Sequence, residues 1–171
     1  MELTAEQAKS MADSMLQGVT GESVTTRKVI AAIPADKLDF KLGEKGKTAA
    51  AIAWHIIRSE AWFASGIFNG EFGPDGEGDV PASLDEILKV YDETVPALTA
   101  KLADLSGEAL SKPISFFGVF NYPAVMYLEF WKCHSVHHRG YLAAYLRAMN
   151  AHVPSIYGGS ADEPFEMPAT A

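Results

Sequence analysis

Apolar residues recur at helical spacing in four segments of the chain, and glycine, proline and charged residues fill the stretches between them. In each segment the apolar positions step by three, four or seven residues, which places them on one face of an α-helix. The predicted helices cover residues 4–33, 48–69, 83–102 and 121–150. No stretch alternates like a strand, and no repeat of about 20 to 50 residues occurs. The pattern predicts an all-α antiparallel four-helix bundle, a single domain over residues 1–171 with an irregular tail at 151–171.

Three of these helices begin at a recognisable capping residue. Thr4 with Gln7 and Ser83 with Glu86 each match the capping box, in which two side chains bond backbone N–H groups at the helix start. Thr48 offers the hydroxyl of an N-cap to the second helix. The sequence therefore predicts three helix N-termini to within a residue or two.

Glycine and proline predict irregularities inside the helices. Gly18 and Gly21 each cost about 1 kcal/mol relative to alanine in a helix interior, so the first helix is open to a kink or a split there. Pro96 removes one backbone hydrogen bond, which predicts a kink near Thr94 in the third helix. Pro123 is predicted in the first turn of the fourth helix, where its missing N–H leaves no hydrogen bond unmade.

Two predicted connections bear on the topology. Residues 70–82 hold four glycines and two prolines. Fully extended, these residues could span roughly 43 Å, whereas the preceding helix is about 33 Å long. The connection could therefore return along the whole helix and leave helices two and three parallel. Residues 106–120 are also predicted as a loop. Its apolar side chains are expected to pack over the end of the bundle or against a partner: Ile114, Phe116, Phe117, Val119 and Phe120.

The charge balance and the cysteine content disfavour several classes of partner. The chain has 22 acidic and 14 basic side chains, a net charge of −8, whereas nucleic acids and anionic membranes need clustered Lys and Arg. Cys133 is the only cysteine, so no intrachain disulfide forms and a reducing compartment fits. Neither a signal peptide nor an apolar run of ~20 residues is present. We therefore expect a cytoplasmic protein without nucleic-acid or membrane partners.

The candidate chemistry centres on His134 and His138, which lie one helical turn apart. They are predicted to share an inward face with Phe130, Trp131, Tyr141, Leu142, Tyr145 and Met149. A divalent metal would satisfy two stacked imidazoles, although hydrogen-bonded core histidines are the simpler alternative. His55 can join them from the second helix, and a three-histidine set leaves at least one coordination position open, as in catalytic zinc sites.

Four further side chains carry alternative readings. His137 lies about 100° around the helix from His138 and is expected to face a helix flank, a subunit contact or solvent. His152 follows the helix and is expected at the surface. Arg139 is either salt-bridged, solvated or an attractor of an anionic substrate. Tyr141 belongs to a stripe that is either core or substrate site.

Other side chains are set aside as ligands or catalytic groups. Ser135 occupies the position of the base in H-E-x-x-H metalloproteases, so that assignment is rejected. Glu60 and Glu129 lie roughly 140° around their helices from the histidine face. Cys133 is predicted to be a small buried hydrophobe and not a nucleophile. The sequence identifies no catalytic residue.

The stretch HSVHHRGYLAAYLR at 134–147, followed by VPSIYGGSADEP at 153–164, closely resembles the DinB family, damage-inducible-type metalloenzymes that include YfiT-like proteins. LDFKLGEKGKTAAAIAWHI and FNYPAVMYLEFWKCH resemble the same family, so the resemblance covers nearly the whole chain. It implies an up-down-down-up bundle with a long crossover between helices two and three, a nickel or zinc ion on His55, His134 and His138, and a homodimer. Tyr141 departs from the pattern, because the family commonly has glutamine there.

Two classes of function follow as hypotheses. The first is a metal-dependent enzyme with a small-molecule substrate. The DinB resemblance implies a transferase that joins a low-molecular-weight thiol, such as bacillithiol or mycothiol, to an electrophile, and a hydrolase is the second enzymatic version. The other class is a non-catalytic, stress-associated protein that binds a metal or a small ligand. Three imidazoles accept nickel, zinc, iron or copper, so the sequence leaves the metal, the substrate and the existence of an enzymatic activity open.

Overall fold

Four long helices make up most of the computed structural model, which describes residues 2–74, 76 and 78–165. They are α1 (Ala5–Ala31), α2 (Ala49–Asn69), α3 (Leu84–Ala103) and α5 (Met126–Ala148). A short 3-10 helix, Ala35–Lys37, follows α1. The short helix α4 (Gly107–Ser111) and the strands β1 (Pro113–Phe116) and β2 (Phe120–Pro123) lie between α3 and α5. The predicted four-helix bundle is confirmed, with a small hairpin in addition.

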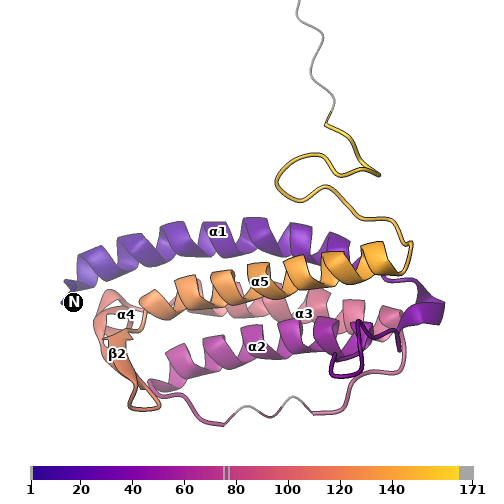
Figure 1. Cartoon of the computed structure of the whole chain (residues 1–171). Helices are drawn as coiled ribbons and strands as arrows, with labels where there is room; N and C mark the ends of the chain where they lie inside the picture. Colours follow the sequence, from indigo (N-terminus) through magenta and orange to yellow (C-terminus); the bar gives the residue numbers. More distant parts are fainter. Residues whose placement is uncertain (1, 75, 77, 166–171) are drawn as a thin grey trace, which may run out of the picture.

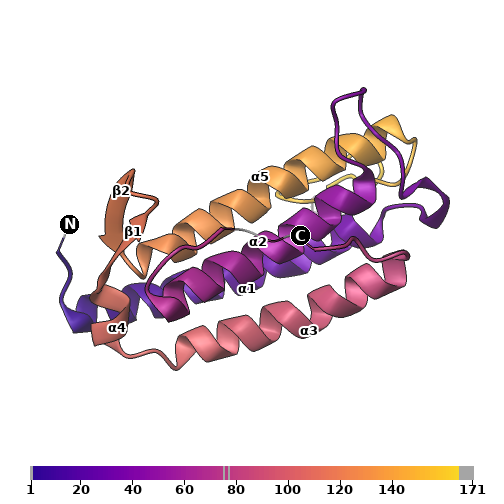
Figure 2. The same cartoon turned by 90° about the horizontal axis from the view of Figure 1, so that it is seen from below.

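The four long helices run in up-down-down-up order (Figure 1). α1 and α5 point one way, α2 and α3 point the other way, and the chain returns along the bundle between α2 and α3 (Figure 2). α5 packs against α1 and α2, and α3 closes the square against the same two helices. The predicted crossover is confirmed, because α2 and α3 run parallel and the described residues of 70–82 between them form no helix or strand. Residues 75 and 77 lie outside the described part.

The predicted capping residues hold the helix starts. Thr4 Oγ1 accepts a hydrogen bond from the Gln7 N–H at 3.2 Å, and Gln7 Oε1 accepts one from the Thr4 N–H at 2.9 Å. Ser83 and Glu86 form the same reciprocal pair at α3. Thr48 caps the first turn of α2. Each cap contributes about 1 kcal/mol, and the three predicted N-termini are confirmed.

The helix interiors are more regular than their glycines and prolines suggest. α1 is one continuous helix through Gly18 and Gly21, so a split there is wrong. α1 packs against α3, α4 and α5, and such packing outweighs a glycine cost of about 1 kcal/mol per residue. α3 also continues through Pro96. The kink near Thr94 stays a prediction.

Residues 106–123 fold into α4 and a β-hairpin, where the sequence predicted a loop and the start of a helix. The paired positions are Pro113–Pro123, Ile114–Tyr122, Ser115–Asn121 and Phe116–Phe120. Residues 117–119 form the turn, in which Phe117 and Gly118 have positive φ angles of 49° and 75°. Pro123 therefore ends a strand and does not lie in a helix, and α5 begins at Met126.

The hairpin lies across one end of the bundle (Figure 1). The Phe116 ring packs on Phe72 and Trp62, with centroids 5.2 Å and 5.8 Å away. This confirms that apolar residues of the segment cover the bundle end. Phe117 and Val119 at the turn stay exposed, with 57% and 78% of their surface accessible.

The core consists of two apolar clusters with buried polar side chains between them. One cluster joins the C-terminal halves of α1 and α5 to the N-terminal halves of α2 and α3. The other joins the opposite halves to the hairpin. Between the two clusters along their helices lie Thr26, Ser59, Glu60, Ser135 and Arg139, which we call the polar layer. Buried polar groups cost free energy unless they are hydrogen-bonded, so the contacts of this layer matter.

After α5 the chain lies against the helix end without regular structure up to residue 165. Asp162 pairs with Arg147 and accepts the Val153 N–H, while Glu163 accepts the Ser155 N–H at 2.8 Å. Residues 151–165 of the predicted tail hold no helix or strand, and residues 166–171 lie outside the described part. None of the described helices combines the length and the apolar character that crossing a membrane requires.

Candidate metal centre

The side chains of His55, His134 and His138 meet between α2 and α5. One ring nitrogen from each lies within 4.8 Å of the other two. The ring centroids are 5.1 Å apart for His55 and His134, 4.5 Å for His55 and His138, and 4.4 Å for His134 and His138. Two nitrogens bound to one ion at ~2.1 Å lie at most about 4.2 Å apart. The upper bound of 4.8 Å is close to this separation, so the three donors lie near a ligating arrangement.

Helix geometry explains why these three side chains converge. His134 and His138 are four residues apart on α5, so their rings stack one turn apart on one side of the helix. α2 packs antiparallel to α5 (Figure 1), and the ring contacts of His55 with His134 and His138 place it at the same level. All three side chains are half-buried, because they lie at the seam between two helices and not in the core.

Burial keeps the two α5 imidazoles neutral. The pKa values of His134 and His138 fall from 6.5 to about 4, first because burial penalises the charged ring and then because neighbouring histidines repel it. At neutral pH each ring therefore offers a lone pair to a metal. His134 Nδ1 is buried and has no hydrogen-bond partner among the described residues. The protein thus leaves one nitrogen of that ring unused.

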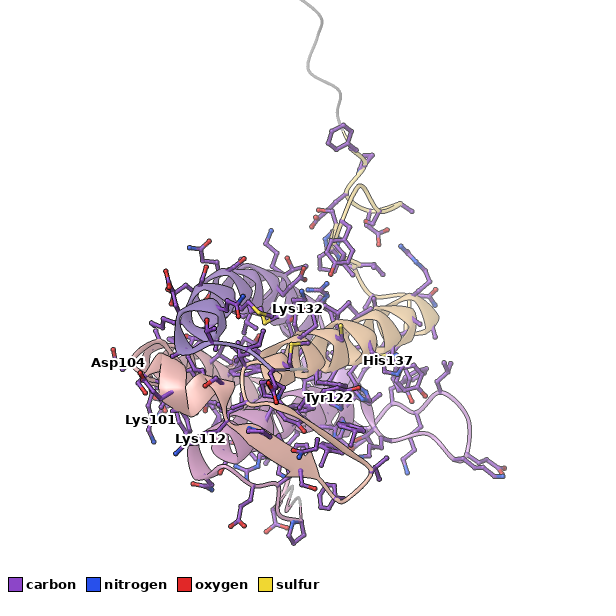
Figure 3. All side chains as sticks on the ribbon, turned by 90° about the vertical axis from the view of Figure 1, so that its left-hand side faces the viewer. Lys101, Asp104, Lys112, Tyr122, Lys132 and His137 are labelled. Atoms are coloured by element: carbon purple, nitrogen blue, oxygen red, sulfur yellow. The ribbon has the colours of Figure 1, made fainter. Side chains whose placement is uncertain are left out.

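The two remaining histidines lie outside the group, as the sequence predicted. His137 is exposed on the outer side of α5 (Figure 3), and its ring centroid lies 4.9 Å from that of His138. His152 is exposed and lies 2.7 Å from Glu163 Oε1. Neither belongs to the described group of potential ligands.

The predicted inward face of α5 is only partly inward. Trp131, Leu142, Tyr145 and Met149 are buried as predicted. Phe130 and Tyr141 are 38% and 39% exposed, so their placement in the core is wrong. Each lies about one turn from a histidine of the group, and successive steps of three and four residues drift around the helix away from the core. The Tyr141 and Tyr145 hydroxyls lie 3.2 Å apart, and Tyr145 donates to the Lys47 carbonyl.

Aromatic rings continue from the histidines toward the hairpin. The Phe63 centroid lies 5.8 Å from that of His134, and the Trp62 centroid lies 5.1 Å from that of Phe63. Phe117 stacks on Trp62 at 6.2 Å with an interplanar angle of 9°. Trp62 Nε1 donates to the Gly73 carbonyl of the crossover. The site therefore has an apolar wall on its hairpin side.

Glu60, set aside as a ligand from the sequence, is a buried neighbour of the site, and this burial was not predicted. It lies off the histidine face as predicted, but it is buried, and its Oε1 accepts a hydrogen bond from Ser135 Oγ at 2.8 Å. Burial raises its pKa from 4.5 to about 7, against smaller opposing effects of the Ser135 and Trp131 side chains. The Trp131 indole N–H completes no hydrogen bond among the described residues. A lone carboxylate between two apolar stretches of one helix is the sequence signal that could have identified Glu60.

Glu129 and Cys133 lie on the solvent side of α5, away from the three histidines. Glu129 pairs with Lys132 at 2.7 Å and accepts a weak hydrogen bond from the Cys133 thiol at 3.4 Å. Cys133 is exposed, so its prediction as a buried hydrophobe is wrong. Partial burial and the neighbouring Glu129 carboxylate raise the pKa of the thiol. It is therefore a poor nucleophile at neutral pH.

Arg139 is buried and forms an ion pair with the partly buried Glu22, which supports the salt-bridged alternative. Its side chain is 1% exposed, and its Nη1 donates to Glu22 Oε2 at 2.6 Å. Its Nη2 donates to the Tyr157 hydroxyl at 2.7 Å, and Tyr157 in turn donates to Glu22. The guanidinium is therefore occupied by protein groups and not directed at a substrate.

A separate hollow of about 780 Å³ lies between α1 and α3. Its lining includes Leu16, Val95 and Pro96, and Asp13 is the only charged side chain in it. None of the three histidines lines it. The side chains with recognisable metal-binding chemistry therefore lie at the α2–α5 seam and not in this hollow.

Solved structures share this fold. A DinB-like protein from Bacillus cereus ATCC 10987 aligns with a TM-score of 0.74 and 25% identity, over 85% of this chain and 97% of its own. The DinB-like protein YjoA from Bacillus subtilis aligns at 0.69 with 23% identity, over 84% and 97%. YfiT from Bacillus subtilis, described as a probable metal-dependent hydrolase with an unusual four-helix bundle topology, aligns at 0.70 with 16% identity, over 88% and 91%. Likeness at 16% identity shows the fold alone.

The sequence comparisons agree with the structural ones. The uncharacterized protein YjoA of Bacillus subtilis (strain 168) is 27% identical over 128 residues, which cover 72% of this chain and 81% of YjoA. The model of the DinB family matches residues 6–166, which include all three histidines of the site. On this match the chain belongs to the DinB family.

Proposed function

We propose that this chain is a metal-dependent enzyme whose divalent ion is held by His55, His134 and His138. The observation that carries the proposal is the convergence of three imidazole nitrogens within 4.8 Å from two helices. Three imidazole donors fill three positions of a four- to six-coordinate ion and leave at least one for a substrate. A structural site, by contrast, is normally closed by a fourth protein ligand.

The residues present fit such an ion. The donors are all nitrogen, and imidazole suits nickel, zinc and iron, so we propose nickel or zinc, with iron as a further candidate. His134 Nδ1, buried and without a hydrogen-bond partner in the described part of the chain, is the kind of atom that a bound cation satisfies. When bound, the ion would supply Lewis-acid stabilisation of an anionic nucleophile.

For the reaction, we propose the transfer of a low-molecular-weight thiol to an electrophilic small molecule. Cys133 is a poor nucleophile because its thiol pKa is raised, so the reacting sulfur has to come from a substrate. No carboxylate belongs to the described histidine group, which favours a reaction that needs no carboxylate base beside the ion. The wall of Phe63 and Trp62 offers an apolar surface for the carbon part of a substrate.

Hydrolysis is the second candidate. YfiT, which shares this fold, is described as a probable metal-dependent hydrolase. A three-histidine ion with an open position also serves hydrolytic enzymes, because it lowers the pKa of bound water toward neutrality. In this chain neither Glu60 nor Glu129 belongs to the histidine group, so the proposal ranks hydrolysis below thiol transfer.

One experiment separates the candidates. Metal-free protein is reconstituted with nickel or zinc and incubated with bacillithiol, mycothiol or glutathione and the electrophile monobromobimane, and in parallel with a panel of activated esters. Wild type and His137→Ala are expected to conjugate one thiol faster than His138→Ala, which loses a proposed ligand. Faster ester cleavage without conjugation would replace the transferase by the hydrolase. Tight metal binding without either reaction would leave a non-catalytic metal-binding protein.

A further inference from the structure

Each ligand histidine of α5 is followed directly by a buried side chain that bonds to another helix. Ser135 follows His134, and Arg139 follows His138. Only 3% and 1% of the surfaces of Ser135 and Arg139 are exposed. Both belong to the polar layer between the two apolar clusters. α5 therefore presents its histidines to the seam and the residues after them to the core.

The partners of these two side chains come from the two helices that flank α5. Ser135 Oγ donates to Glu60 Oε1 of α2 at 2.8 Å, in a fully buried hydrogen bond. Arg139 Nη1 donates to Glu22 Oε2 of α1 at 2.6 Å. We call these two bonds the tethers. One tether joins α5 to α2 and the other joins α5 to α1. Rotation of α5 about its own axis in either direction would therefore stretch one of the two bonds.

Stability alone does not account for the tethers. Replacing a buried polar pair by apolar side chains of similar volume is often neutral or stabilising by about 1 to 4 kcal/mol. Glu60 and Arg139 also keep unpartnered atoms, since Glu60 Oε2 and Arg139 Nε make no hydrogen bond within the described residues. The best-attested use of such buried polar contacts is to fix the register of one helix against another.

The metal site needs that register to be accurate. With its side chains, a helix has a radius of about 5 to 6 Å, so a rotation by about 20° moves a donor atom by roughly 2 Å. This displacement equals an entire zinc–nitrogen bond of ~2.0–2.1 Å. Apolar packing alone tolerates side-chain rearrangement, whereas a hydrogen bond of 2.8 Å between two buried side chains does not tolerate a shift of that size.

We propose that the two tethers fix the rotation of α5 about its own axis and so hold the imidazoles of His134 and His138 toward His55. Glu60, Ser135, Glu22 and Arg139 are then positioning residues, since none of them belongs to the group of potential ligands. The inference rests on the metal-binding part of the proposed function and adds the residues that shape the site. It requires no particular reaction.

The test uses cobalt(II) as the probe, because its visible absorption reports coordination geometry and needs no substrate. Metal-free wild type and Ser135→Ala are titrated with cobalt(II), and the affinity is measured by competition with a chelator. Loss of an outer partner typically weakens metal binding by about 10- to 100-fold. We expect a weakening of that size in Ser135→Ala, together with a changed visible band.

Tyr127→Phe is the matched control on the same helix. Tyr127 is also fully buried, and its hydroxyl donates to the Ile114 carbonyl of β1 at 2.6 Å. The variant thus removes one buried hydrogen bond of α5 that is not adjacent to a ligand. It is expected to lower the melting temperature without changing the cobalt(II) affinity or spectrum. Equal effects of the two variants on cobalt(II) binding would overturn the proposal.

Two variants of Glu60 test the tether from its other side. Glu60→Gln keeps an acceptor for Ser135 and is expected to bind cobalt(II) within a few-fold of wild type. Glu60→Leu removes the acceptor and is expected to resemble Ser135→Ala. Wild-type binding of cobalt(II) in both Ser135→Ala and Glu60→Leu would refute the positioning role and leave the metal site standing. If wild type itself bound no cobalt(II), the proposed metal site would fail, and the inference with it.

Discussion

His55 on α2 lies edge-on to His138 on α5, with ring centroids 4.5 Å apart and an interplanar angle of 78°. The contact joins two positions that are 83 residues apart in the sequence (138 − 55). The variant His55→Ala keeps only the two histidines of α5 as donors. Loss of a residue that contacts a ligand but not the metal typically weakens metal binding by about 10- to 100-fold. We expect His55→Ala to weaken it by more than that. Isothermal titration of metal-free protein with zinc or nickel measures the loss.

The matched control for this prediction is His137→Ala. His137 is exposed beside His138 but outside the group of potential ligands. Its removal is expected to leave the affinity within a few-fold of wild type. A larger loss in His137→Ala than in His55→Ala would show that the ion binds on the outer side of α5.

Glu60 predicts a specific pH dependence of stability. Its pKa is about 7 in the folded protein against 4.5 for an ordinary glutamate, because burial favours the neutral form. A carboxyl with a raised folded pKa contributes stability that is fully present below about pH 4.5 and is lost as the pH rises through about 7. The difference of about 2.5 units corresponds to about 3 kcal/mol.

Urea denaturation of metal-free protein at pH 5 and pH 8.5 tests this. Tyr91, whose pKa is raised by burial, stays neutral across this range. Wild type is expected to lose about 2 to 3 kcal/mol more than Glu60→Gln over the interval, because glutamine does not ionise. Parallel profiles for the two proteins would mean that Glu60 is already ionised when buried.

The ion pair of the buried Arg139 with Glu22 is expected to contribute more to stability than an exposed pair. Glu22→Ala leaves the Arg139 guanidinium buried without its carboxylate, which typically costs about 3 kcal/mol or more. Arg27 and Asp92 form a comparably short pair at 2.6 Å, but both are nearly half exposed. Asp92→Ala is therefore expected to cost less than about 1 kcal/mol. Chemical denaturation at one pH compares the two, and equal costs would contradict the assignment of Arg139 to the core.

Two glycine substitutions are expected to act in opposite directions. A Cβ at Gly107 would overlap the backbone carbonyl of Ala5, where α4 touches the start of α1. Gly107→Ala is therefore expected to cost about 1 to 3 kcal/mol. A Cβ at Gly21 meets nothing within 4 Å, so Gly21→Ala is expected to stabilise α1 by about 1 kcal/mol. Melting temperatures of the two variants show the contrast, and stabilisation by Gly107→Ala would contradict the close approach of α4 to α1.

Local signals in the sequence were sufficient for the helix starts and for the three histidines. Thr4, Thr48 and Ser83 act within one turn, and His134 and His138 meet through helical spacing alone. His55 required only that α2 and α5 be neighbours, which a four-helix bundle makes common. These features depend on short-range chemistry, so they are readable without coordinates.

The hairpin and the polar layer were not readable in this way. β1 and β2 are four residues each, too short to show an alternating pattern, and their pairing is completed by packing on α2. From the sequence, the direction of Glu60 was compared only with that of the histidines. Because α2 packs against both α5 and α3, it buries a wider surface, which includes Glu60. Cys133 was predicted wrongly because it was assigned to the core by residue type, whereas its side chain is exposed and contacts Glu129 one turn earlier on α5.

Because α2 and α3 run parallel, the connection between them, residues 70–83, is a long segment without helix or strand in its described part and a suitable place to cut the chain. A cut in that connection would separate α1 and α2, with His55, from α3 to α5, with His134 and His138. Neither half would then hold a complete set of donors. Reassembly of the two fragments would be linked to the ion by mass action, so a split version of this protein would act as a metal-dependent heterodimer.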